Sequence, residues 1–246
     1  LVSHLFPETL IMLKRRQVLL AAGASISSLP FPAFAQTAGS SLKGTPIENT
    51  KLTHLTDQRD APVVFYTPKV DPQAVLEIFK AVGLPVQGKV GLKVVFGNNR
   101  DRAKMIDPDL LKPIADELRA TLIESNYMDS ARSDATTHLS TAKELGYDRV
   151  APIDILDADR EIVIPVRNGY HLKEFITGSH LANYDTLVSI VRFKGHNLQR
   201  YGGSMKNLSI CLGTARGACQ IHSAGEVTDY YRPSSPKETS ESMADA

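Results

Sequence analysis

The sequence predicts a layered α/β domain whose sheet is mostly parallel. From residue 61 onward, short β-branched apolar runs alternate with runs in which apolar residues recur every three or four positions. A helix between two strands of one sheet is the crossover that parallel strands require. With 42% apolar and 22% charged residues, the chain can build a core of ordinary size.

The expected elements follow from these runs and from the residues that flank them. Strands are expected at residues 62–67, 89–96, 121–124, 149–153, 161–166 and 186–193, and helices at 73–82, 107–119 and 133–145. Asp71 fits the N-cap of the first helix, and Gly83 fits its end. Pro113 is expected to kink or break the second helix, and Gly146 is expected to end the third.

Three further segments complete the predicted organisation. Residues 36–60 are expected to form a linker, so the α/β domain covers 61–246. An antiparallel excursion is expected at 157–170. Residues 240–246 resemble the start of a helix, which suggests a domain that is incomplete at its C-terminus; a frayed terminus is the alternative.

Residues 1–35 are expected to be an export signal peptide. Arg15 and Arg16 precede an apolar run at 18–29, and residues 33–35 (Ala-Phe-Ala) fit the cleavage rule for small residues. The paired arginines resemble a twin-arginine signal, which places the protein in the periplasm. An ordinary Sec signal and an uncut anchor are the alternatives, and no membrane span is expected once the signal is removed.

Charge, cysteine content and missing signatures exclude several classes of protein. Lys and Arg number 28 against 27 Asp and Glu, so the chain is not a polybasic nucleic-acid binder. Two cysteines cannot provide a four-cysteine zinc or iron–sulfur site. No P-loop, G-x-G-x-x-G, H-E-x-x-H, C-x-x-C or G-x-S-x-G motif is present, which removes the common nucleotide-binding, zinc-peptidase and hydrolase interpretations.

The segment 193–225 carries the candidate chemistry. It follows a predicted strand, where ligands bind in open α/β sheets, and it interleaves glycines with cationic side chains that suit a small anion. We expect His196, His222 and Lys206 to be catalytic, and His196 and His222 could instead hold a metal ion. The expected ligand-binding residues are Gly202, Gly203, Asn207 and Asp154.

Each of these residues also has a structural interpretation. A glycine-rich segment can be only a loop, and Asp154 can cap a turn. His138 is expected on the surface of the third helix. Cys211 and Cys219 could form a disulfide in an oxidising compartment or remain free thiols.

Several short motifs resemble those of one protein family. They are Val64–Thr67, Gly88–Lys93, Ala151–Leu156, Gly178–Asp185, Phe193–His196, Gly202–Ile210 and His222–Gly225. In this order they resemble the bacterial and archaeal family called domain of unknown function 362, over residues 61–246. The resemblance implies an α/β domain that occurs alone or joined to a ferredoxin-like module with two iron–sulfur clusters. It also implies a family domain that continues beyond residue 246.

The residues and the resemblance together give one functional expectation. We expect an uncharacterised exported protein that transfers electrons or protons on a small anionic ligand. Its cofactor would be a metal ion, or an iron–sulfur centre on a ferredoxin-like redox partner, because the cysteines of this chain encode no cluster. A noncatalytic anion-binding module and a truncated gene remnant are the alternatives.

Overall fold

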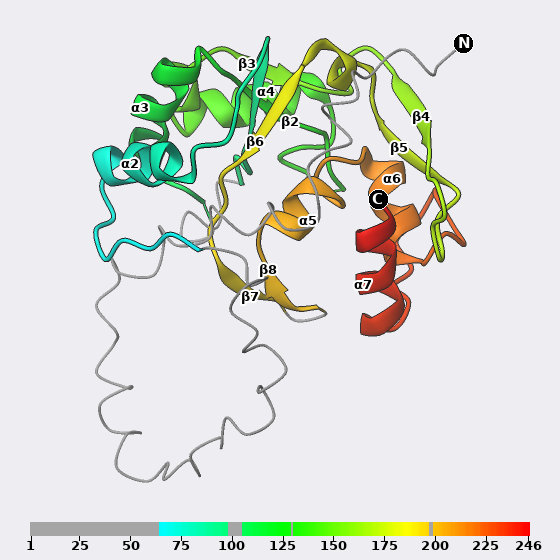
Figure 1. Ribbon diagram of the computed structural model, residues 1–246. Coiled ribbons are helices and arrows are strands. Elements are labelled where there is room, and N and C mark those ends of the chain that lie inside the picture. The colour runs from blue at the N-terminus through cyan, green and yellow to red at the C-terminus, as the bar shows by residue number, and fades with distance from the viewer. Residues whose placement is uncertain (1–63, 98–104, 129, 197–198) are drawn as a thin grey trace, which may run out of the picture.

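Four parallel strands form the centre of the fold (Figure 1). The computed structural model describes residues 64–97, 105–128, 130–196 and 199–246; the expected signal peptide and linker lie outside them. The strands are β1 (Val90–Lys93), β2 (Thr121–Glu124), β3 (Ile153–Ile155) and β6 (Thr186–Ser189), in the spatial order β3-β2-β1-β6. Leu92 of β1 pairs with Leu122 on one side and Val188 on the other. The α/β fold with a parallel sheet is therefore confirmed.

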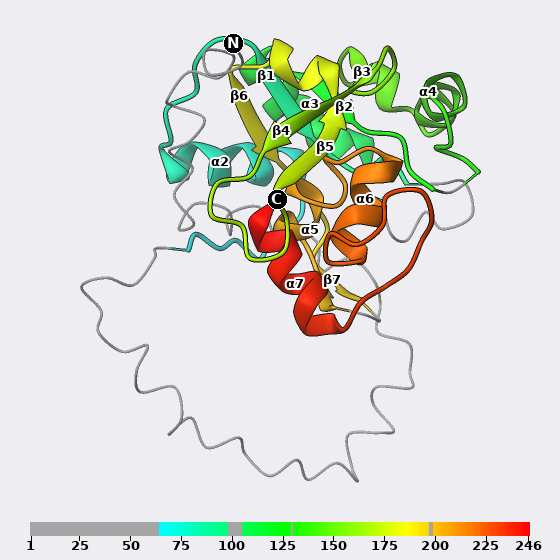
Figure 2. The ribbon, with the colours of Figure 1, turned by 90° about the vertical axis from the view of Figure 1, so that its right-hand side faces the viewer.

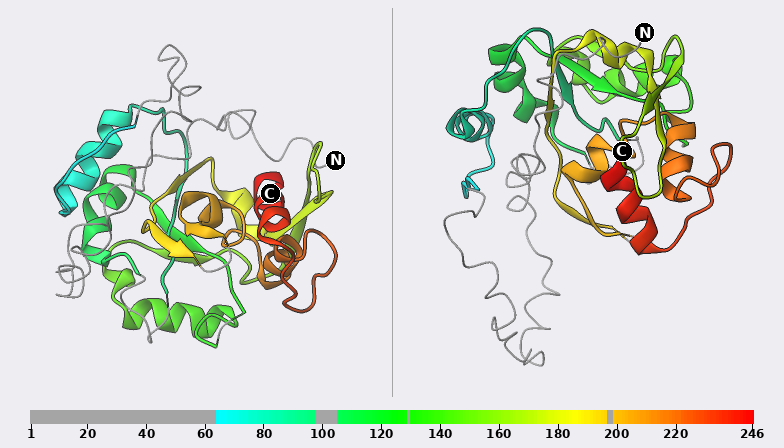
Figure 3. Two further views of the ribbon diagram at one scale, coloured as in Figure 1. Left: turned by 90° about the horizontal axis from the view of Figure 1, so that it is seen from below. Right: turned by 45° about the vertical axis from the view of Figure 1, so that its right-hand side comes forward.

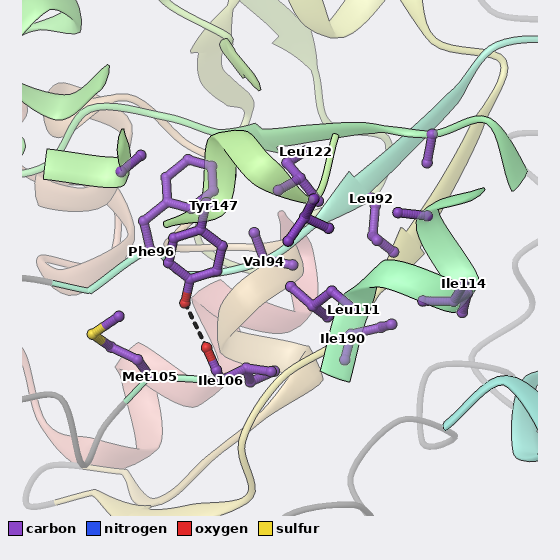
Figure 4. Packing of buried hydrophobic residues seen from close by; sticks show 14 of the residues in the cluster. Leu92, Val94, Phe96, Met105, Ile106, Leu111, Ile114, Leu122, Tyr147 and Ile190 are labelled. Atoms are coloured by element: carbon purple, nitrogen blue, oxygen red, sulfur yellow. Dashed lines mark hydrogen bonds between the residues drawn. The ribbon is translucent and has the colours of Figure 1, made fainter. Parts of the chain in front are cut away.

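Three helices cover one face of this sheet. They are α2 (Pro72–Val82), α3 (Pro108–Leu118) and α4 (Ala135–Glu144), and they appear in cyan and green on the same side of the strands (Figure 1). Leu92 and Leu122 are fully buried against Leu111 and Ile114 of α3. Figure 4 shows this core, in which the Tyr147 hydroxyl donates a 2.7 Å hydrogen bond to the carbonyl oxygen of Ile106.

The opposite face of the sheet is covered by the later part of the chain. The hairpin strands β4 (Glu161–Pro165) and β5 (Glu174–Gly178) lie there with α5 (Ser204–Leu208), α6 (Ala215–His222) and α7 (Pro236–Asp245) (Figure 2). Ile123 of β2 packs with Phe175, Ile221 and Met243 in a second core. Because neighbouring residues of a strand point to opposite faces, Leu122 and Ile123 join different cores. Both views of Figure 3 separate these two layers by colour.

Shorter elements link the larger ones. The 3₁₀ turns η5 (Tyr147–Arg149) and η6 (Ser179–Asn183) precede β3 and β6. The antiparallel pair β7 (Lys194–His196) and β8 (Arg200–Gly202) leads from β6 to α5.

The predicted helix ends are formed by the residues that the sequence indicates. The Asp71 carboxylate accepts a 2.8 Å bond from the Ala74 amide, and Gly83 closes α2 with a positive φ of 64°. Gly146, at φ 88°, follows α4 in the same way. Pro113 lies inside α3 without breaking it, so the helix predicted across this proline is confirmed. The helix continues because its apolar face packs on the sheet, and packing outweighs the missing amide bond.

Two strand predictions need correction, and one strand was not predicted. Residues 64–67 form no strand; Val64 and Tyr66 are 61% and 75% exposed, because β1 is already paired on both sides. The expected strand 149–153 is displaced to β3, since residues 147–149 form a 3₁₀ turn. The antiparallel excursion is confirmed, although its second strand, β5, was not predicted.

Helix α7 is fastened to the loop before β5. The Asp245 carboxylate accepts hydrogen bonds from the backbone amides of Tyr170, His171 and Leu172, at 2.7–3.0 Å. His171 Nε2 also lies 2.9 Å from a carboxylate oxygen of Glu241. Among the described residues, no helix has the length and apolar character needed to cross a bilayer.

Candidate functional site

The site lies where the chain reverses its direction of winding. Strands β1 and β6 are neighbours in the sheet, but α3 follows β1 on one face whereas β7, β8 and α5 follow β6 toward the other. Such a topological switch point, at the carboxyl ends of parallel strands, is where open α/β sheets bind ligands. Lys93 and Ser189, the last residues of β1 and β6, mark it here.

Asn207 joins the two strands at this point. Its Nδ2 donates to the backbone oxygen of Lys93 at 3.1 Å and to Ser189 Oγ at 2.9 Å. Its Oδ1 accepts a 3.0 Å bond from Lys93 Nζ. The side chain is almost fully buried, so α5 is held against the end of the sheet by satisfied polar contacts.

Lys93 is a fully buried lysine at the end of β1. Its Nζ also donates to the carbonyl oxygen of Val94 at 2.8 Å. Burial lowers the pKa of Lys93, and the negative charge of Glu124 works in the opposite direction.

Glu124, the last residue of β2, accepts bonds from three sides. The Phe96 amide donates to it at 2.8 Å, Arg132 Nη1 at 3.1 Å, and His138 Nε2 lies at 3.2 Å. Burial alone would raise the pKa of Glu124, but the bond to His138 and the charges of Lys93, His138 and Arg132 bring it down to about 2. Glu124 is therefore an ionised carboxylate with engaged oxygens.

His138 was expected on a helix surface, and that prediction is wrong. Its side chain is fully buried, with Nε2 on Glu124 and Nδ1 3.3 Å from Asn126 Oδ1. The polar residues around it in α4 hid this role, because a single buried histidine leaves no apolar periodicity.

Lys206 and His196 are in direct contact in the site. Lys206 Nζ lies 2.7 Å from His196 Nε2, and the backbone N–H of Gln199 donates to His196 Nδ1 at 3.3 Å. Burial first, and then the neighbouring Arg132, lower the pKa of Lys206. Burial and the charge of Lys206 also lower the pKa of His196.

His222, at the end of α6, is the third basic side chain of this group. Burial, followed by the charges of Lys206 and His196, lowers its pKa to about 4. Among the described residues, nothing hydrogen-bonds its buried Nδ1. The ring packs edge-on against Tyr231, with 5.0 Å between centroids. The structure thus places His196, Lys206 and His222 within electrostatic range of one another.

The other predicted site residues divide into two groups. Gly202 ends β8 and Gly203 precedes α5, so both lie beside Lys206 in the chain. Asp154 belongs to a separate cluster: it accepts 2.7 Å bonds from Tyr184 Oη and from His180 Nδ1. Asp154 therefore holds the ring of His180 in place and lies apart from the other expected ligand-binding residues.

The described residues do not fit a resident metal centre. They contain no group of three or more His, Cys, Asp or Glu side chains that could hold an ion. His196 Nε2 is engaged by Lys206. Cys211 and Cys219 are free thiols, and Cys211 lies within electrostatic range of Lys93 and Lys206.

Sequence reasoning missed four residues of the site: Lys93, Glu124, Arg132 and His138. A signal was available for two of them. Lys93 is a charged residue within a predicted apolar strand, and Glu124 is the last residue of another. Charged residues in such strands point to the carboxyl edge of the sheet, where open α/β sheets bind ligands. Arg132 and His138 lie in segments without such a marker.

Comparison with known proteins gives one finding. The family described as Domain of unknown function (DUF362) matches residues 90–246. No curated protein and no solved structure matches the chain.

Proposed function

This chain belongs to the family described as Domain of unknown function (DUF362), and from its site we propose that the protein binds a small metabolite bearing a carboxylate or phosphate and transfers a proton on it. The ligand would lie at the carboxyl edge of the parallel sheet, beside Lys206. That description of the family names no activity, so the chemistry of the residues carries the proposal.

The anion-binding part of this proposal rests on one observation, an excess of basic side chains at the carboxyl edge of the parallel sheet. Arg132 lies within electrostatic range of both Lys93 and Lys206, and His196 and His222 lie within range of Lys206. Among the described residues, the carboxylate that acts on this group is Glu124, and it already accepts bonds from Arg132 and the Phe96 amide. A site with more basic than acidic side chains is stabilised when it binds an anion.

The proton-transfer half rests on Lys206 and His196. Their nitrogens are 2.7 Å apart, and burial lowers the pKa of each, so a proton can pass directly between them. His222, with a pKa of about 4, is a neutral imidazole at pH 7. We assign His196 and His222 to proton transfer, because no third ligand for a metal accompanies them among the described residues.

Titration calorimetry with L-lactate and with sulfate tests this proposal. Neither anion changes its protonation near pH 7, so proton uptake on binding belongs to the protein. We expect binding with proton uptake, because an anion favours the charged forms of Lys206 and His196. Lys206→Ala should weaken binding at least about tenfold, as expected for a lost charge-assisted bond.

Lys112→Ala is the matched control, because Lys112 lies exposed on α3, outside the site. It should bind as the unmodified protein does. Absence of binding by both anions, or equal weakening by the two variants, would overturn the proposal. Binding without proton uptake would overturn its proton-transfer half and leave an anion-binding module.

A further inference from the structure

The hydrogen bonds around His196 determine where its proton lies. A neutral imidazole has one N–H and one nitrogen with a free lone pair. The Gln199 backbone N–H donates to Nδ1, so Nδ1 holds the lone pair and Nε2 holds the hydrogen. Nε2 is therefore the donor in its 2.7 Å contact with Lys206 Nζ. An ammonium has no acceptor site, so this hydrogen bond forms with, and favours, the neutral amine form of Nζ.

The surroundings of Lys206 support this protonation state. Burial is the largest effect on the pKa of Lys206 and lowers it, because burial disfavours the ammonium form. The charge of Cys211 works in the opposite direction and that of Arg132 in the same direction, and the pKa is lowered on balance. The residue is nevertheless only half-buried, so a ligand can reach it. A neutral, accessible amine beside cations is the arrangement of a nucleophilic lysine.

From this geometry we propose that Lys206 forms an imine with the carbonyl carbon of a small aldehyde or ketone that also bears a carboxylate or phosphate. The inference rests on the proposed function for its anionic group, which the charges near Arg132 and Lys93 favour. It goes further by naming the reacting group of the ligand and the atom that attacks it.

The step balances without an oxidant or a reductant. The Nζ lone pair forms a bond to the carbonyl carbon, and the carbonyl π electrons move to oxygen. Both hydrogens of the amine leave with that oxygen as water, and a carbon–nitrogen double bond remains. His196 Nε2–H, which loses its acceptor when Nζ reacts, is placed to donate to the departing oxygen.

His222 gives the second observation that points to a ligand. Its side chain is only 2% exposed, and no described residue bonds its Nδ1. A buried polar atom without a partner is costly. Lys206 already acts electrostatically on His222, and a hydroxyl of the carbinolamine formed at Lys206 would satisfy this nitrogen.

Borohydride trapping tests the imine directly. The full chain is incubated at pH 7 with pyruvate or with glycolaldehyde phosphate, then reduced with sodium cyanoborohydride, and the modified lysine is located by peptide mass spectrometry. We expect Lys206 to be modified at least about tenfold more than exposed Lys112 and Lys237, because ordinary lysines are almost fully protonated at this pH. Equal modification of these lysines, or none at Lys206, would overturn the inference.

Uncharged analogues separate the contributions of the anion and the amine. Methyl pyruvate and glycolaldehyde lack the charge of the two probes but keep their carbonyl groups. They should modify Lys206 at least about tenfold less. If Lys206 reacts more with pyruvate, the ligand bears a carboxylate; if it reacts more with glycolaldehyde phosphate, the ligand bears a phosphate. Equal reaction of the charged and uncharged compounds would contradict an anionic ligand.

Two variants separate chemistry from folding. Lys206→Arg keeps a long basic side chain at this position but cannot form an imine, so the adduct should disappear. His196→Ala should move the pH profile of trapping upward, because the bond that favours the neutral amine is gone; an unchanged profile would contradict this role. Lactate and sulfate have no carbonyl group, so their binding tests the proposed function alone. If they bind while no imine is trapped, only this further inference fails.

Discussion

Lys93 and Asn207 are bonded to each other twice, although 114 positions separate them in the chain. The Lys93 ammonium donates to the Asn207 carbonyl oxygen, and the Asn207 amide donates to the Lys93 backbone. This reciprocal pair ties α5, which carries Lys206, to the end of β1. The position of the candidate site therefore depends on a contact at the centre of the sheet.

Asn207→Ala should lower the free energy of unfolding by about 1–3 kcal/mol, because it leaves the buried Lys93 with one acceptor fewer. Urea denaturation measures this change. Asn183→Ala, on an exposed turn, is the matched control and should change stability by no more than about 0.5 kcal/mol. Equal effects of the two changes would show that the reciprocal pair contributes nothing.

Glu124 should make stability fall in acid. Its pKa is lowered from 4.5 to about 2 in the fold, so its contribution is complete above the unfolded pKa and is lost as the pH falls between those values. The contribution is on the order of 3 kcal/mol. In Glu124→Gln, denaturation midpoints measured from pH 6 to pH 2 should fall less steeply than in the unmodified protein. A variant with an unchanged pH slope would contradict this assignment.

Asp154→Asn should affect His180 and leave the anion site intact. The bonds from Asp154 and Asp159 raise the pKa of His180, so its contribution to stability is present below pH 6.5 and is lost as the pH rises through the folded value. The variant should lower that pKa, as followed by NMR titration of the ring. Lactate binding should not change; weakened binding would place Asp154 in the site.

Gly178→Ala should destabilise the fold by about 1–3 kcal/mol or more. A Cβ at this position would lie 2.1 Å from the backbone carbon of Leu156, which cannot move aside as a flexible side chain can. Thermal unfolding measures the loss. Gly195→Ala is the control, because nothing lies within 4 Å of its added Cβ. The prediction fails if both alanine variants unfold at the same midpoint temperature as the unmodified protein.

Export stays a prediction of the sequence. Replacing Arg15 and Arg16 by lysine keeps the positive charge but removes the twin-arginine pair. The precursor should then remain uncut in the cytoplasmic fraction of cells that normally export it. Normal export of this variant would indicate a Sec signal, and cytoplasmic retention of the unmodified chain would contradict export itself.

The sequence by itself determined the order of most elements and several of their ends. Asp71 and Gly83 specify the limits of α2 locally, because capping depends on the residue and its immediate neighbours. The β2 strand falls on its predicted residues, because its apolar run is buried on both faces. The segment 193–225 was likewise identified from its glycines and cations alone.

Only the tertiary structure decided which polar groups meet. Hydrophobic periodicity shows which face of an element is apolar, but it does not show which strand will pair with residues 64–67, or that none will. Nor does it show that Glu124 and His138 are buried together. Burying a charged side chain costs free energy unless hydrogen-bond or ion-pair partners offset that cost. The fold brings those partners from distant parts of the chain, so the sequence pattern around one residue does not show them.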